Sequence, residues 1–249
     1  MIYERIQKLL ESCTTETPSF PPTLIYNEGW LLRLVLDWFF THSVLNHPLE
    51  FHANAKWFSE ALLPSAFLAR FRGDPLAESW THADGVIGHF SIGRDGKTDL
   101  SLLEDANQLV ILEAKMFSGL SSGVSNAKYY DQAARNIACI TEVFHRANAS
   151  PRSLSHIGFY VLAPLSQIEK GVFTNAINRE SIKYKVEKRV RDYSGIKDQW
   201  YSDWFLPSFQ QIEIMEISWE EIIETIREQE PETANSLESF YKMCIEFNE

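Results

Sequence analysis

The pattern of hydrophobic and polar positions divides the chain into a helical N-terminal part, a β-rich middle and a mixed C-terminal part. After a Pro-rich lead-in at 18–22, apolar residues recur at helical spacing, which predicts a helix that Asn27 can cap. This apolar stripe consists of Leu31, Leu32, Val35 and Phe39. A second helical pattern runs from Lys56 to Phe71, and Pro64 is expected to break or kink it.

Beyond His82 the pattern changes to short apolar runs separated by turn residues. Apolar residues between 86 and 92 lead into Gly93-Arg94-Asp95-Gly96, and Asp-Gly between apolar runs predicts a β-hairpin. Its second strand is expected over Thr98 to Leu103. The polar turn 104–107 then leads into the apolar run from Leu109 to Met116. We therefore expect a three-stranded meander here.

The rest of the chain alternates between helix and strand. A Ser/Gly loop at 118–125 precedes a helix expected from about Asn126 to Arg146, and His156 to Ala163 reads as a buried strand. Gln211 to Ile217 is expected as a further strand, and the following Ser218-Trp219-Glu220-Glu221 is typical of a capping box. This order predicts an α/β fold in which one mixed β-sheet is flanked by helices on both faces.

The length of 249 residues favours a single domain, with a core at about 24–164 and an acidic, helical C-terminal extension at about 165–249. The net charge is −11, but residues 213–249 alone carry −9, so the rest of the chain carries only −2. Residues 179–198 carry +3, which suits either a phosphate contact or a solvated helix face laced with ion pairs. Charge therefore does not decide the function.

Neither a membrane nor an oxidising compartment is expected for this chain. The longest apolar run is interrupted by Arg33 and Asp37 and is shorter than a membrane span requires. The N-terminus lacks the pattern of a secretory signal. The chain contains three widely spaced cysteines, an arrangement that fits reduced thiols better than a disulfide framework. We expect a cytoplasmic protein.

The strongest chemical signal is a set of charged residues in the predicted meander. If the turn is centred near Ala106, Asp99 lies directly across from Glu113, and Lys115 shares their face of the sheet. Two opposed carboxylates repel each other unless a cation lies between them. Such oxygen donors suit Mg²⁺ or Mn²⁺. The alternative is a pair of solvent contacts at the sheet edge, with Lys115 as their salt-bridge partner.

With Thr98-Asp99 and Glu113-Ala114-Lys115 the sequence resembles the PD-(D/E)xK nuclease superfamily, whose members have the restriction-endonuclease-like fold. Thr98 replaces the motif's Pro. The resemblance implies that Asp99, Glu113 and the Ala114 carbonyl hold the metal, which acts as a Lewis acid on the scissile phosphate. It also implies that Lys115 orients or deprotonates the attacking water and offsets developing charge.

Two accessory positions also resemble this superfamily, namely Glu28 as an extra metal ligand and Gln132 on the helix after the E-x-K strand. Glu28 is equally well explained by the helix dipole, which favours a carboxylate at a helix N-terminus. Gln132 shares a helix face with Lys128, Arg135 and Asn136. That face could hold a phosphate backbone or be simply solvated.

The resemblance implies a cytoplasmic, bacterial, Mg²⁺-dependent nuclease that hydrolyses phosphodiester bonds in DNA. The alternative is a catalytically inactive protein of the same fold that binds DNA or another protein. The acidic C-terminal region suits a protein partner, and the sequence leaves a homodimer open. No membrane partner is expected.

Overall fold

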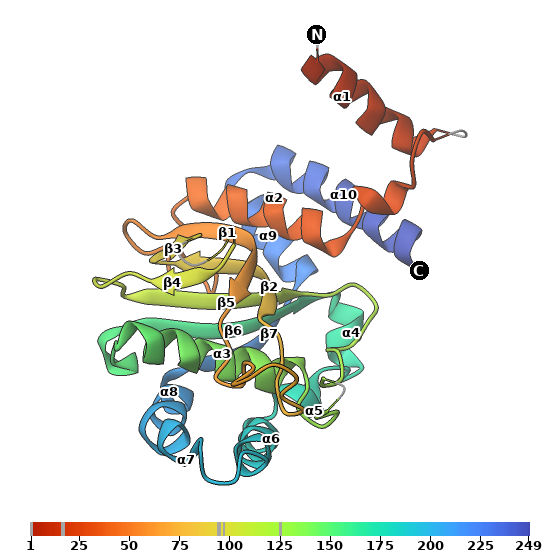
Figure 1. Cartoon of the computed structure of the whole chain (residues 1–249). Helices are drawn as coiled ribbons and strands as arrows, with labels where there is room; N and C mark the ends of the chain where they lie inside the picture. Colours follow the sequence, from red (N-terminus) through yellow and green to blue (C-terminus); the bar gives the residue numbers. More distant parts are fainter. Residues whose placement is uncertain (1, 16–17, 94–95, 97, 125) are drawn as a thin grey trace.

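The computed structural model describes residues 2–15, 18–93, 96, 98–124 and 126–249, and a five-stranded mixed sheet forms its centre (Figure 1). The strand order is β1-β2-β5-β6-β7. These strands are β1 (Lys56–Leu63), β2 (Thr81–Gly88), β5 (Gln108–Ala114), β6 (His156–Ala163) and β7 (Glu213–Ser218). β2 is antiparallel to both of its neighbours, whereas β5, β6 and β7 are parallel.

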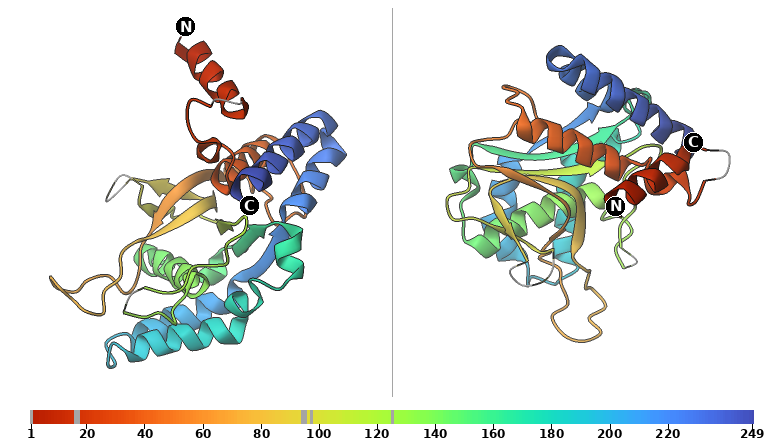
Figure 2. Two further views of the ribbon diagram at one scale, coloured as in Figure 1. Left: turned by 90° about the vertical axis from the view of Figure 1, so that its right-hand side faces the viewer. Right: turned by 90° about the horizontal axis from the view of Figure 1, so that it is seen from above.

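Helices cover both faces of this sheet (Figures 1 and 2). One face carries α2 (Glu28–Thr41), α9 (Trp219–Gln229) and α10 (Pro231–Asn248). The other carries α3 (Gln132–Ala147), with α6 (Arg179–Arg191) packed against α3. The strand residues alternate accordingly, so that Ile111 contacts the α3 side and Leu112 the α2 side. The predicted α/β class with helices on both faces is confirmed.

Shorter elements connect these layers. They are η1 (Ser12–Thr14), η2 (Pro22–Leu24), η3 (Pro151–Ser153), α4 (Leu165–Glu169), α5 (Thr174–Ile177), α7 (Asp198–Trp200), η4 (Tyr201–Phe205) and α8 (Leu206–Gln211). Helix α1 (Ile2–Glu11) projects from the body and buries none of its residues (Figures 1 and 2). Within the described residues, no helix combines the length and the apolar character needed to cross a membrane.

Several local predictions are confirmed. The Asn27 side chain caps α2 by accepting a hydrogen bond from the Trp30 N–H at 3.0 Å. Ser218 caps α9 in the same way, accepting from the Glu221 N–H at 3.0 Å. The strands expected near 156–163 and 211–217 are β6 and β7. The C-terminal region expected as a helical extension therefore also supplies the fifth strand of the sheet.

The helix predicted over Lys56 to Phe71 is wrong. Residues 56–63 form β1, and Trp57 and Phe58 pack on opposite faces of the sheet, as successive strand residues do. A short apolar run does not by itself distinguish a helix from a strand. The helix predicted from Asn126 begins only at Gln132, because Asp131 caps it by accepting from the Ala134 N–H.

The predicted meander is only partly correct. β3 (Phe90–Ile92) and β4 (Leu100–Leu102) form the expected hairpin, although residues 94 and 95 of its turn lie outside the described residues. However, β4 does not continue on to pair with β5, whose neighbours are β2 and β6. Gly88 separates the two sheets. It has a φ of 143°, and a Cβ there would lie 2.2 Å from the Gln108 carbonyl oxygen, so only glycine fits.

Candidate active site

Asp99 does not lie across from Glu113, and this part of the predicted site is wrong. Because β4 pairs with β3, Asp99 lies beside β1 instead, where it forms an isolated bridge with Leu62. Its side chain is 3% exposed and accepts a hydrogen bond from the Gly96 N–H. It borders a hollow that it shares with His82. Asp99 and Glu113 would face each other only if the strands on either side of the 104–107 turn were paired, and they are not.

Asp84 occupies the place expected for Asp99. The antiparallel register pairs Gly85 with Leu112, so the next step along β2 sets Asp84 across from Glu113 on β5. The Asp84 Oδ2 atom accepts a hydrogen bond from the Ala114 N–H at 2.8 Å, which fixes the carboxylate beside β5. The sequence carried a signal for this residue, since Asp84 is an acid just before the apolar pair Val86-Ile87.

Glu113 is the centre of the site and is fully buried near the end of β5. Lys115 donates a hydrogen bond to its Oε1 atom at 2.6 Å, and Gln132 donates to the same oxygen. Asn136, one turn further along α3, donates to Oε2 at 3.3 Å. The pKa of Glu113 is raised to about 8, mainly by burial and also by the negative charge of Asp84, while Lys115 opposes the shift.

Lys115 is held as a charged group at this site. Its backbone is fixed on both sides, because its N–H donates to the Leu162 carbonyl and its own carbonyl accepts from the Trp219 indole N–H at 3.0 Å. Burial alone would lower the pKa of the Lys115 amine, but the Glu113 carboxylate and the charges of Asp84 and Glu28 raise it overall.

Glu28 is the first residue of α2 and is half-buried. Its negative charge contributes to the raised pKa of Lys115, although the two residues are distant in sequence. It also lies in the first turn of its helix, where the dipole favours an acid. Both explanations offered for Glu28 therefore agree with its position.

Gln132 begins α3 and joins the site to the preceding loop. Its side-chain oxygen accepts from the Ser121 N–H, and its own N–H donates to the Ser121 carbonyl, both at 3.0 Å. The sequence placed Asn136 on a face available to phosphate, yet it is fully buried against Glu113. Arg135 also turns inwards, donating to Thr81 at 3.0 Å, so the phosphate-binding face expected on this helix is not present as predicted.

The residues around Glu113 fit a small, hard cation. Within the described part of the chain, no group of three or more His, Cys, Asp or Glu side chains could hold a metal by itself. Mg²⁺, however, is commonly held by one or two carboxylates together with water and substrate phosphate. Asp84 and Glu113 supply two carboxylates on adjacent strands, and a bound cation would offset the repulsion between them.

Searches against protein-family models, curated proteins and solved structures find no match for this chain.

Proposed function

We propose that this protein is a metal-dependent nuclease of the PD-(D/E)xK type, with Asp84 rather than Asp99 as the first acid. The observation that carries the proposal is the opposition of Asp84 and Glu113 on adjacent strands, with Lys115 bound to Glu113 at 2.6 Å. With this assignment, the segments Ala83-Asp84 and Glu113-Ala114-Lys115 resemble the two elements of the motif. The restriction-endonuclease-like identity of the fold is part of this proposal.

In the proposed reaction the two carboxylates would hold Mg²⁺ or Mn²⁺, with the Ala114 carbonyl as a further donor. When bound, this ion would supply Lewis-acid chemistry at the scissile phosphodiester. The amine of Lys115 orients the attacking water and offsets negative charge on the phosphate. Gln132 and Asn136 fix the Glu113 carboxylate by hydrogen bonds, and Glu113 keeps Lys115 protonated with a smaller contribution from Glu28.

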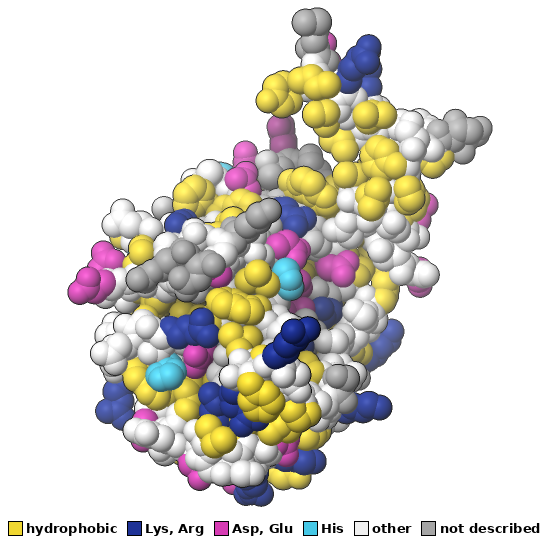
Figure 3. All heavy atoms as spheres, viewed as in Figure 1, with side chains coloured by type: hydrophobic (Ala, Val, Ile, Leu, Met, Phe, Trp, Pro, Cys, Tyr) yellow, Lys and Arg dark blue, Asp and Glu magenta, His cyan; other side chains and the backbone are white. Residues whose placement is uncertain are grey.

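DNA is the proposed substrate, and the charge distribution around α3 supports a polyanion. The −9 segment at 213–249 forms β7, α9 and α10, and these two helices cover the face of the sheet opposite α3. Lys and Arg side chains gather over the lower part of the molecule, around α5 and α6 (Figure 3). In α6, Lys185 pairs with Asp131 at 2.6 Å, next to Gln132. Phosphate groups bind such basic surfaces.

The test is cleavage of a panel of single-stranded and double-stranded DNA and RNA with Mg²⁺, Mn²⁺ or chelator. We expect metal-dependent hydrolysis of DNA, and a loss of at least about a hundred-fold for Lys115→Met, because the charge that stabilises the transition state is removed. The matched control is Lys8→Met, which removes an exposed lysine of the projecting helix α1. Binding of DNA with no cleavage under any condition would instead favour the catalytically inactive binding protein.

A further inference from the structure

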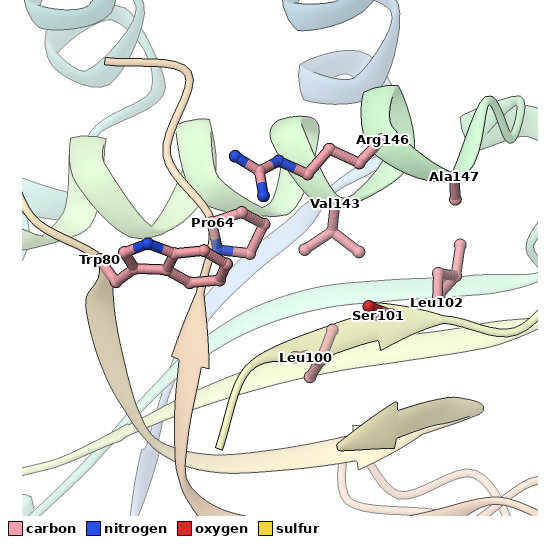
Figure 4. Close-up of a pocket in the computed structure, with 8 residues that line it drawn as sticks. All are labelled: Pro64, Trp80, Leu100, Ser101, Leu102, Val143, Arg146 and Ala147. Carbon is pink, nitrogen blue, oxygen red and sulfur yellow. The ribbon is translucent and has the colours of Figure 1, made fainter. Parts of the chain in front are cut away.

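A hollow that does not include the residues around Glu113 lies between α3 and β4 (Figure 4). Its volume is about 360 Å³. Leu102 and Val143 contribute apolar walls from the strand and the helix, and Ser101 supplies a hydroxyl. Trp80 stands at one end, and Arg146 extends back from α3 towards Trp80 and Pro64 (Figure 4). The hollow thus combines apolar walls, an aromatic ring and a few polar groups, as small-ligand sites do.

The strand that carries Asp84 connects this hollow to the candidate active site. Trp80 immediately precedes β2, and Trp80, His82 and Asp84 follow one another at alternate positions. At about 3.3 Å per residue, Trp80 lies roughly 13 Å along the chain from Asp84. The hollow that Asp99 borders, with a volume of about 430 Å³, is lined by both Trp80 and His82. It therefore covers the first part of the path along β2 from Trp80 towards Asp84.

The chemistry of the hollow favours an uncharged aromatic ring over an anion. The Arg146 guanidinium carbon lies 5.2 Å from the Trp80 ring centroid, and Glu142 accepts a hydrogen bond from Arg146 at 3.0 Å. Because Glu142 balances the charge of Arg146, a phosphate gains little here. An aromatic base can stack against an indole, and guanidinium and hydroxyl groups can bind the edge of a base.

We propose that this hollow is a subsite for one unpaired nucleobase, which makes single-stranded or frayed DNA the substrate class. The inference rests on the proposed nuclease function, because it assigns the base to the same strand of DNA that reaches Asp84. A base that is paired inside a duplex cannot enter a hollow recessed between a helix and a strand, so duplex DNA must open locally to bind.

The experiment compares two probes of equal length and charge in chelator, where no cleavage occurs. One is a short fluorescent oligodeoxynucleotide, and the other is the same sugar-phosphate chain without bases. We expect the wild type to bind the base-containing probe on the order of ten-fold more tightly, as one stacked base would give. Trp80→Ala should remove this preference, and Trp80→Phe should retain most of it. Phe40→Ala, at an exposed aromatic of α2 in the opposite layer, should leave it unchanged.

Two results would overturn the inference. One is equal binding of both probes by the wild type, and the other is an undiminished preference in a folded Trp80→Ala variant, as judged by its thermal melt. The proposed nuclease function fails separately. A protein that prefers the base-containing probe through Trp80 but never cleaves DNA keeps the subsite and loses the catalytic assignment.

Discussion

Replacing Glu113 by Gln should stabilise the metal-free protein at alkaline pH. In the folded state the pKa of Glu113 is raised from 4.5 to about 8, first by burial and then by Asp84. Between these pH values the unfolded chain has released the proton and the folded protein still holds it. Folding stability therefore falls as the pH rises from about 4.5 to about 8, and the loss is complete above the folded pKa.

The size of this effect follows from the shift itself. A rise from 4.5 to about 8 corresponds to roughly 5 kcal/mol of destabilisation at pH 8 or above. The substitution leaves the size of the side chain unchanged but weakens charge-assisted hydrogen bonds from Lys115 and Gln132, which costs about 1–2 kcal/mol. The Asn136 Oδ1 atom is buried without a partner and can accept the new amide N–H. A net gain of about 3 kcal/mol is expected.

Urea unfolding of both proteins in chelator, from pH 5 to pH 9, measures this gain. The wild type should lose stability across this range relative to Glu113→Gln, and the two curves should diverge as pH rises. Adding Mn²⁺ at a hundred times its dissociation constant should restore about 2.7 kcal/mol to the wild type and almost nothing to the variant. Parallel curves in chelator would refute the buried, proton-holding state of Glu113.

Three further changes test other parts of the structure. Lys115→Met should lower activity, and it should lower the melting temperature at pH 9, where Glu113 is ionised and would lose its cation; calorimetry would show this, and an unchanged melt at that pH would contradict the ion pair. His47→Gln should make stability fall less steeply at acid pH. Burial lowers the pKa of His47 to about 4, so the wild type loses about 1–2 kcal/mol of folding stability, allowing for partial exposure, as the pH falls from 6.5 to 4. An equally steep loss in the variant would exclude this cause. Gly88→Ala should cost roughly 2–4 kcal/mol in urea unfolding, since its Cβ would lie 2.2 Å from the Gln108 oxygen, and a neutral result would mean that β2 and β5 can separate there.

Features that depend on a few neighbouring residues could be predicted from the sequence. The caps at Asn27 and Ser218 and the buried strand β6 follow from short patterns, and each forms as predicted. The predicted contact between Glu113 and Lys115 also forms, because an acid and a base at alternate positions of one strand share a face. Gln132 joins them by donating a hydrogen bond to Glu113.

Strand pairing could not be read from the sequence in the same way. Three apolar segments in succession look like a meander, but Gly88 turns the chain out of the main sheet, so that β3 and β4 pair with each other. β5 is therefore left to pair with β2, and Asp84 rather than Asp99 faces Glu113. The inward turn of Arg135 depends on Thr81, which is distant in sequence. Such contacts are decided by packing across the whole core.

The most direct test of the proposed site is the cleavage rate of Asp84→Asn compared with that of Asp99→Asn, with Mn²⁺ and single-stranded DNA. Both substitutions remove one carboxylate charge with little change in shape, and thermal melts confirm whether each variant is folded. We predict that Asp84→Asn loses at least about a hundred-fold in rate, whereas folded Asp99→Asn stays within about three-fold of the wild type. Loss of cleavage in folded Asp99→Asn with normal activity in Asp84→Asn would contradict the site described by the structure.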